Sequence, residues 1–286
     1  MAKHTRRPND RGVSEAIGFM LIFGIVIAGI GLVTLYGYPL LLQQQVSADE
    51  KIMEKNMIVL QNDIKSLAYK TVPFKETSLK IGGGALTVYN SSYSPPSSAI
   101  EINTFAGTNS YLPPFIPNTR FTPGELRYES MSSQTDISLQ NGAVALRKHA
   151  EPGSVMLAEP RWFFDSSTNK MVINLINITS TNIMAKEGIG TVQMSLVGEP
   201  YFNESAIPVG QEIEIVYRPD ATQDYSVAWD NYIWNSWNIP QSYKLARTVD
   251  AGNGAITYRL KNTGGSTGSS DMTLVIKIFE VQIRSI

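Results

Sequence analysis

The side chains able to carry catalysis are few in this chain of 286 residues. It contains no cysteine, which excludes disulfide frameworks, thiolate zinc sites, iron–sulfur clusters and cysteine nucleophiles. Of the two histidines, His4 lies in a basic N-terminal segment, and His149 lies in a sequence typical of an exposed turn. No nucleophile–base pair or acidic pair is evident. The sequence therefore predicts a protein that is not an enzyme and that uses no metal or cofactor.

Aromatic residues near the C-terminus indicate binding chemistry instead. Residues 229–237 hold three of the four tryptophans, Trp229, Trp234 and Trp237, beside asparagine and aspartate side chains. Flat rings next to amides and carboxylates are what a sugar-binding surface needs. An aromatic corner packed under a loop is the alternative, because large rings commonly fill a core. The segment is thus a candidate glycan-binding site or a corner of the core.

The glycine-rich and acidic motifs match no ligand-binding loop. Gly82-Gly83-Gly84 and residues 264–268 lack the Lys-Ser/Thr of a phosphate loop, so both are interpreted as β-turns. Asp220 and Asp224 lack the glycine and terminal glutamate of an EF-hand, which predicts solvated turn residues. The net charge of −1 provides no basic field, so a nucleic-acid partner is not expected.

The most informative segment is an apolar run over residues 16–42. It holds 27 consecutive residues without a charge. As a helix it would span roughly 40 Å, more than the hydrocarbon core of a bilayer. A cleaved secretory signal has a shorter apolar region. The run predicts a retained transmembrane helix, and Pro39 predicts a kink or a membrane-exit break near its end.

The flanks of this run predict its orientation. Basic residues precede it, which marks the cytoplasmic side: Lys3, Arg6, Arg7 and Arg11. The rest of the chain would then lie outside the cytoplasm. Three Asn-x-Ser/Thr sequons fall in that part, which makes their asparagines candidate glycosylation sites: Asn90, Asn177 and Asn203.

The N-terminus resembles that of archaeal type IV pilin-like proteins. The residues that carry the resemblance are Arg11-Gly12, a short polar stretch and a long apolar helix, in that order. The resemblance implies cleavage by a prepilin-type peptidase between Gly12 and Val13, on the cytoplasmic side, with the apolar helix kept. It covers roughly residues 6 to 42. Glu15 stands where many haloarchaeal members carry proline, and the chain is longer than typical pilins, which favours a minor or pilin-like surface protein.

Two features of the apolar helix suggest lateral assembly. The resemblance implies that Glu15, near the mature N-terminus, pairs with the α-amine of a neighbouring subunit. The alternative is a residue of the first helical turn, where a carboxylate suits the helix dipole. Gly24, Ala28 and Gly31 form a small-residue face that would allow close helix packing in lipid.

A second helix and a β-rich domain are predicted beyond the apolar run. Residues 43–72 read as an amphipathic stalk helix with an a/d-like apolar stripe, which would pack against the outer domain: Met53, Met57, Leu60, Ile64 and Leu67. From about residue 71 the pattern has period two, with strands expected at several places: residues 86–88, 191–196, 212–217, 256–260 and 272–278. Residues 162–178 are predicted to form a hairpin around a turn at 165–169.

The predicted fold is α+β: a long N-terminal transmembrane and stalk helix followed by a large, antiparallel, β-sandwich-like extracytoplasmic domain. Its segments are a basic leader (1–12), a transmembrane helix (13–42), the stalk helix (43–72) and the β-domain (73–286), which a weak boundary near residues 151–153 would split in two. The predicted function is a membrane-anchored, pilin-like structural protein of the cell surface or a surface filament. Its partners would be the membrane, the peptidase and other pilin-like subunits. The alternative is an adhesin that binds carbohydrate through residues 229–237.

Overall fold

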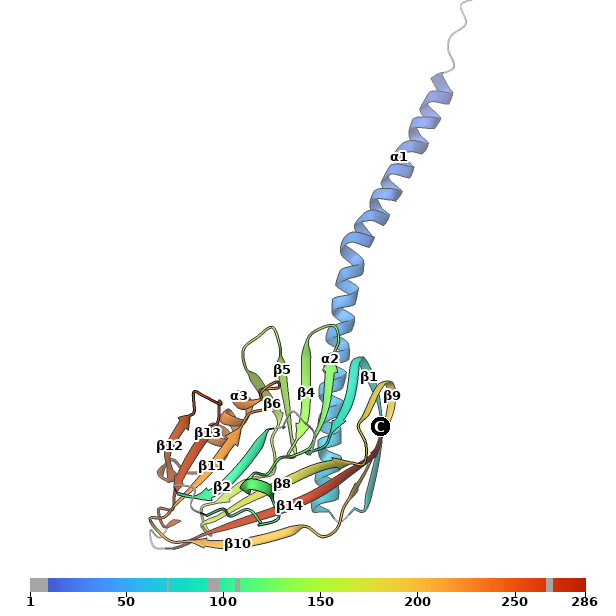
Figure 1. The fold of residues 1–286 in the computed structure, drawn as a ribbon. Helices are drawn as coiled ribbons and strands as arrows, with labels where there is room; N and C mark the ends of the chain where they lie inside the picture. The colour runs from blue at the N-terminus through green and yellow to red at the C-terminus, as the bar shows by residue number, and fades with distance from the viewer. Residues whose placement is uncertain (1–9, 71, 92–97, 106–108, 266–269) are drawn as a thin grey trace, which may run out of the picture. The chain divides into compact units, whose positions relative to one another are not determined.

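The computed structural model describes residues 10–70, 72–91, 98–105, 109–265 and 270–286 (Figure 1). The predicted basic residues Lys3, His4, Arg6 and Arg7 lie outside the described residues. The chain divides into two compact units, Met1–Ala48 and Asp49–Ile286. The second unit contains the end of the long helix together with every strand, so residues on both sides of 151–153 belong to one unit.

The N-terminal helix continues past Pro39, with a π-helical turn just before it. Helix α1 (Asp10–Leu32) is joined to α2 (Tyr38–Tyr69) by a π-helical turn (Val33–Gly37), in which the N–H of Tyr38 donates to the carbonyl of Val33. Pro39 has no N–H, and its ring crowds the carbonyl four residues earlier. The wider π-turn is a known way to interrupt the α-helical ladder. The π-turn is a local irregularity of the kind that a kink near Pro39 implies, whereas a break of the helix there is wrong, since α2 continues to Tyr69. Where the membrane ends along this helix stays a prediction.

The apolar stripe of α2 is buried in the second unit, as predicted. All five predicted side chains are fully buried in one core with apolar residues of the large sheet: Met53, Met57, Leu60, Ile64 and Leu67. Spacings of four and three keep them on one helix face. Gln61 lies beside them, and its amide donates to the carbonyls of Gly142 (2.7 Å) and Glu159 (2.9 Å). These bonds attach the helix to the sheet by polar contacts as well.

The β-domain is built on a ten-stranded sheet. Its order is β6-β5-β4-β3-β1-β9-β14-β8-β7, with β10 also paired to β14. The strands are β1 (Phe74–Tyr89), β3 (Glu125–Ser130), β4 (Thr135–Gln140), β5 (Ala143–Lys148), β6 (Ser154–Ala158), β7 (Phe163–Asp165), β8 (Lys170–Ser180), β9 (Met184–Leu196), β10 (Tyr201–Ile207) and β14 (Met272–Ser285). All the predicted strands and the hairpin at 162–178 are present. One pair departs from the antiparallel prediction, because β8 and β14 run parallel.

A second sheet covers one face of the first. It has the order β12-β13-β11-β2, from β2 (Ala99–Thr104), β11 (Glu212–Arg218), β12 (Lys244–Val249) and β13 (Ile256–Lys261). A core of alternate residues from β8, β14, β11 and β13 lies between the two sheets. The core that contains the α2 stripe lies on the opposite face of β8 and β14. The large sheet is thus the middle layer between a small sheet and a helix (Figure 1).

Two glycine positions show what the strands require locally. Gly82-Gly83-Gly84 lies inside β1 as a bulge, where the register with β9 shifts between Ile81 and Leu86, so the predicted turn is wrong. Gly83 has a φ of +67°, and a Cβ on Gly84 would overlap the backbone carbonyl oxygen of Glu129 on β3, which explains glycine at these two positions. Asn141 and Gly142, both with positive φ, form the two-residue turn between β4 and β5. Asn-Gly suits this turn because both of its residues tolerate a positive φ.

Candidate functional site: an exposed apolar helix

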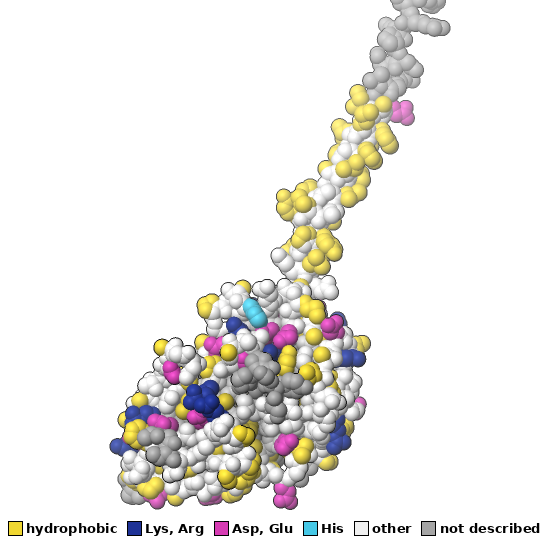
Figure 2. All heavy atoms as spheres, in the orientation of Figure 1, with side chains coloured by type: hydrophobic (Ala, Val, Ile, Leu, Met, Phe, Trp, Pro, Cys, Tyr) yellow, Lys and Arg dark blue, Asp and Glu magenta, His cyan; other side chains and the backbone are white. Residues whose placement is uncertain are grey.

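The first candidate site is the apolar helix of the N-terminal unit. Its large hydrophobic side chains between residues 17 and 42 are exposed, from 43% at Leu42 to 71% at Met20. Figure 2 shows hydrophobic side chains covering this helix. By length and composition, Glu15–Tyr69 is the one helix of the described residues that could cross a membrane. A helix that is hydrophobic all round needs lipid or other helices around it.

The residues predicted to act in assembly lie on this helix. The Glu15 side chain is exposed near its start. Gly24, Ala28 and Gly31 are all exposed, and their spacings of four and three place them on one face. A Cβ built on Gly24 or Gly31 meets no other atom of the chain within 4 Å. The structure thus leaves this small-residue face open, and a role in assembly stays a prediction.

The predicted processing site lies at the N-terminal end of α1. The backbone of Arg11, Gly12 and Val13 is helical in the structure. A peptidase would need this segment in an extended form, so cleavage would require the first helical turn to open. Isolated helix ends open readily, because their first N–H groups have no intrahelical partner. Cleavage after Gly12 stays a prediction.

The three candidate glycosylation sites are half-buried and hydrogen-bonded. The amide nitrogens of Asn90 and Asn203 donate to backbone carbonyls at 3.1 and 3.2 Å. The side-chain oxygen of Asn177 accepts from the backbone N–H of Gly124 at 3.1 Å. A glycan attaches at the amide nitrogen and replaces one of its two hydrogens, so occupancy of Asn90 or Asn203 would keep these bonds only if the sugar took the hydrogen that does not form them. All three sites stay predictions.

The tryptophan segment belongs to the core between the two sheets. Residues 229–237 comprise the end of a short helix, α3 (Ser226–Asp230), a π-helical turn (Asn231–Ser236) and Trp237, which follows that turn. Trp229 and Trp237 are only 1% and 2% exposed, and Trp234 is half-buried. The ring faces of Trp229 and Trp237 are therefore not free to stack on a sugar. The glycan-binding interpretation is wrong for Trp229 and Trp237, and the alternative of an aromatic corner is confirmed.

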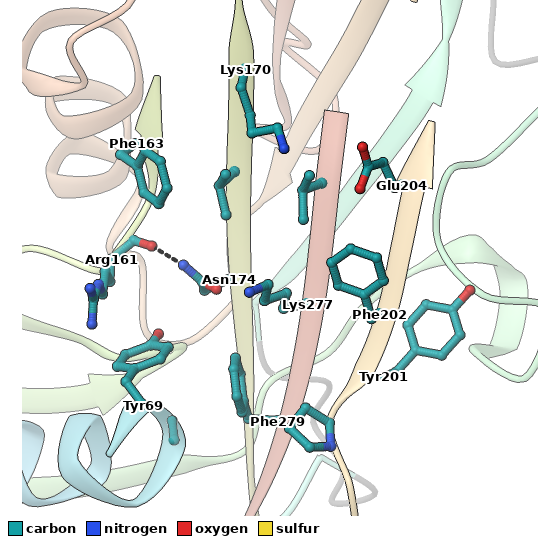
Figure 3. Close-up of a pocket in the computed structure, with 14 residues that line it drawn as sticks. Tyr69, Arg161, Phe163, Lys170, Asn174, Tyr201, Phe202, Glu204, Lys277 and Phe279 are labelled. Atoms are coloured by element: carbon teal, nitrogen blue, oxygen red, sulfur yellow. Dashed lines mark hydrogen bonds between the residues drawn. The ribbon is translucent and has the colours of Figure 1, made fainter. Parts of the chain in front are cut away.

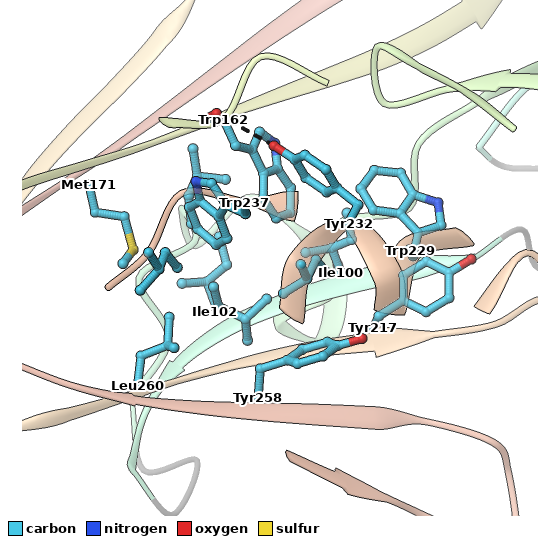
Figure 4. Close-up of a cluster of buried hydrophobic side chains, with 14 of the residues drawn as sticks. Ile100, Ile102, Trp162, Met171, Tyr217, Trp229, Tyr232, Trp237, Tyr258 and Leu260 are labelled. Atoms are coloured by element: carbon cyan, nitrogen blue, oxygen red, sulfur yellow. Dashed lines mark hydrogen bonds between the residues drawn. The ribbon is translucent and has the colours of Figure 1, made fainter. Parts of the chain in front are cut away.

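Ring–ring contacts account for this corner (Figure 4). Trp162 contacts Trp237 at 5.2 Å and Trp229 at 5.8 Å between ring centroids, and Trp229 stacks on Tyr217 at 5.6 Å. Such offset and edge-on pairs are each favourable beyond the area that they bury. Burial raises the pKa of the Tyr217 and Tyr232 hydroxyls, because a charged phenolate is disfavoured there. These phenols stay neutral and structural at neutral pH.

The polar residues singled out in the sequence have local structural roles. His149 lies in an exposed turn, as predicted, and its Nε2 is 2.5 Å from an Asp136 carboxylate oxygen. Asp224 is exposed, as predicted, but Asp220 is buried and accepts from the backbone N–H of Thr222 at 2.6 Å, so it is not a solvated residue. Among the described residues, no three His, Asp or Glu side chains are placed to hold a metal ion.

A groove on the large sheet is a feature that sequence reasoning missed. It has a volume of about 600 Å³ and is lined by residues of β7, β8, β14, β10 and the end of α2 (Figure 3). We call it the sheet-face groove. Its residues lie up to about two hundred positions apart in the chain. The period-two pattern predicts which face of a strand a residue lies on, but it does not predict which strands pair with one another. No linear motif could have indicated it.

The structure defines a class of protein: a β-sandwich-like domain attached to a long helix whose N-terminal half is exposed and apolar. The model of a family of unknown function, DUF7289, matches residues 11–238, and the chain belongs to that family. The match includes the apolar helix, the buried stripe of α2 and most of the strands. No curated protein and no solved structure matches the chain.

Proposed function

We propose that this protein is a membrane-anchored, exported structural protein of the type IV pilin-like kind. Its apolar helix would hold it in the membrane, with the N-terminus cytoplasmic and the β-domain outside. The observation that carries the proposal is the all-round exposure of apolar side chains over residues 17–42. The 27 uncharged residues of this run are more than enough to cross the hydrocarbon core of a bilayer, and water is a poor solvent for such a surface.

The way in which α2 is used supports a pilin-like protein over a simple anchor. From Met53 to Leu67, α2 supplies five fully buried side chains to the core of the β-domain. A flexible tether would have no such stripe. The first half of this helix is apolar all round and would anchor the protein in the membrane, while its amphipathic second half packs in the core of the β-domain. The pilin-like resemblance implies a helix with these two roles.

The proposal is tested first at the mature N-terminus. A pilin-like leader requires a mature chain that begins at Val13, and Gly12→Leu should block the cut. Mass spectrometry of protein purified from its native membrane reads the terminus directly. A mature chain beginning at Met1 or Ala2 would contradict pilin-type processing. A chain that begins beyond residue 40 would mean that the apolar run is a removed signal.

The orientation is tested by protease added to cells stripped of their outer layer. The β-domain should be digested, while the segment before Glu15 should stay protected. The basis is the basic flank, with four Lys or Arg residues before the apolar run. Protection of the whole β-domain would contradict the assignment.

Lateral assembly is tested by cross-linking in membranes. In lipid, helix association depends on close packing at small residues and on paired polar groups. Gly24→Leu and Glu15→Gln should therefore reduce cross-linked multimers and leave insertion unchanged. Gly29→Leu is the matched control, because residue 29 lies about 140° around the helix from residue 24. Equal multimer recovery from Gly24→Leu and Gly29→Leu would show that the small-residue face has no role.

A further inference from the structure

We propose that the sheet-face groove binds an acidic saccharide, meaning a short chain of sugars that carries carboxylate or sulfate groups. This inference does not depend on the proposed function, because the groove lies entirely within the second unit. It rests on four observations: the register of the strands that form the groove, the hydrogen-bonded backbone of its floor, its unpaired cations and its exposed rings.

The strand register places the groove residues in rows across the sheet. One row runs from Phe163 on β7 through Val172 and Val275 to Glu204 on β10. The next row joins Asn174, Lys277 and Phe202. Alternate residues of a strand face one side of the sheet, so all of these side chains face the same way. Figure 3 shows them around one open space, with Tyr69 of α2 at its end.

The backbone of the groove floor is largely hydrogen-bonded. It is formed by β14, which is paired with β8 on one side and with β10 and β9 on the other, and by β8, which is paired with β7 over residues 170–172 only. Beyond residue 172, side chains bond the β8 backbone instead: the indole N–H of Trp162 donates to the carbonyl of Asn174, and the side-chain oxygen of Asn141 accepts from the N–H of Ile176. A peptide that binds by adding a strand needs an unpaired strand edge. A ligand in this groove is therefore recognised mainly through side chains. This favours a ligand with its own apolar faces and charged groups over an extended peptide.

The charge of the groove favours an anion. Arg161, Lys170 and Lys277 line it, against the single carboxylate of Glu204. None of these three cations forms an ion pair with a described carboxylate. Lys170 and Lys277 lie at opposite ends of the valine floor, roughly 13 Å apart along the strands. Two separated cations above an apolar floor suit a ligand with more than one anionic group.

The aromatic walls supply apolar faces for sugar rings. Phe163 and Phe202, on opposite sides of the floor, are 45% and 55% exposed, so a ring face of each is open to a ligand. The ammonium of Lys277 lies 5.7 Å from the centre of the Phe202 ring, so a cation and an aromatic face are offered together. The C–H faces of a sugar pack on such rings, while its carboxylates or sulfates reach the cations.

Single-stranded nucleic acid also binds aromatic rings and cations, but it needs a basic groove that follows its backbone. The described residues that line this groove include three cations and Glu204, and the chain has a net charge of −1. An acidic saccharide therefore fits better. Nucleic acid and acidic peptides enter the test as competing outcomes.

The test uses the full chain in detergent micelles and titration calorimetry. The probes are a trimer of galacturonic acid and a sulfated, heparin-derived tetrasaccharide, and the neutral methyl ester of the trimer is the ligand control. We expect binding of at least one acidic probe, weaker binding at high salt and little binding of the ester. Lys277→Gln and Lys170→Gln should each weaken binding about 5- to 10-fold, and Phe202→Ala about 3- to 10-fold.

Two variants elsewhere on the β-domain serve as matched controls. Lys261→Gln removes an exposed strand lysine outside the groove. Phe105→Ala removes a ring that is 47% exposed and that also carries a cation, Arg259, at 4.2 Å. Both should bind like the parent. The proposal is overturned if neither acidic probe binds at millimolar concentration or if groove and control variants behave alike. It is also overturned if a hexathymidylate or a triglutamate binds more tightly than both saccharides.

Discussion

The packing of α2 against the large sheet leads to a matched prediction on one residue type. Ile64 and Ile52 lie on the same helix, but Ile64 is fully buried and Ile52 is 38% exposed. Replacing each by alanine removes the same three carbons. The gain in helix propensity from isoleucine to alanine is also the same at both sites. The difference between the two variants therefore isolates the contribution of burial.

The magnitude follows from the buried atoms. At about 0.8 kcal/mol for each buried CH₂ or CH₃ group, Ile64→Ala loses roughly 2.5 kcal/mol of transfer free energy. The cavity that remains adds to this, so the expected loss of unfolding free energy is about 3 kcal/mol. Ile52→Ala, at a partly solvated position, should lose about 1 kcal/mol or less. The difference of about 2 kcal/mol corresponds to about 4–8 °C in Tm for a domain of this size.

The assay is thermal and urea unfolding of the full chain in detergent micelles, followed by tryptophan fluorescence. Trp162, Trp229 and Trp237 are all buried in the β-domain, so their emission reports the unfolding of that domain. Far-UV circular dichroism of the unheated variants checks that the helix is still formed. Equal loss of stability in Ile64→Ala and Ile52→Ala would refute the argument that the α2 stripe is part of the domain core.

Three further predictions concern the β-domain. The pKa of Asp165 is lowered to about 2, chiefly because its carboxylate accepts hydrogen bonds from the hydroxyls of the β7–β8 turn. Because the pKa is lower in the folded state, ionised Asp165 stabilises the fold at pH values above the usual carboxyl pKa of about 4, and this stabilisation is lost as the pH falls through 2. The difference in Tm between the parent and Asp165→Asn should therefore be present at pH 7 and disappear toward pH 2. Gly124→Ala should prevent folding, judged by soluble yield, because its Cβ would overlap a β8 carbonyl oxygen. Gly198→Ala, where nothing lies within 4 Å but φ is +64°, should cost only about 1 kcal/mol and still fold. Trp229→Ala should lower stability by about 3–5 kcal/mol and half-buried Trp234→Ala by clearly less; equal effects would contradict the core assignment.

The local pattern of the chain was sufficient to predict both parts of the long helix and seven of the described strands, whereas β2 to β6, β10 and β12 were not predicted. The apolar run of residues 16–42 and the α2 stripe follow from charge content and from spacings of three and four, which depend only on helix geometry. The strands and the hairpin at 162–178 follow from period two and turn residues. Each of these signals concerns residues that are close in the chain, so each can be read without knowing the rest of the fold.

The partners of these elements were decided by the tertiary structure. Period two assigns residues to sheet faces but not strands to neighbours, so the parallel pairing of β8 with β14, about a hundred residues apart, was not predictable. Gly82-Gly83-Gly84 has the composition of a turn, and the pairing of β1 with the distant strands β3 and β9 makes it a bulge within β1 instead. The same limit applied to the candidate sites. An aromatic cluster serves equally for a surface or a core, and burial between two sheets placed Trp229 in the core.

The sequence by itself determined that the chain has a membrane-length apolar helix, an amphipathic helix after it and a β-rich remainder, because these properties are set by local composition and periodicity. Only the tertiary structure decided which surfaces of the β-domain are open. Lys170, Lys277 and Phe202 belong to three different strands, and each has an ordinary sequence context. They meet because hydrogen-bond register aligns those strands, and register is a property of pairs of distant segments that no single segment encodes.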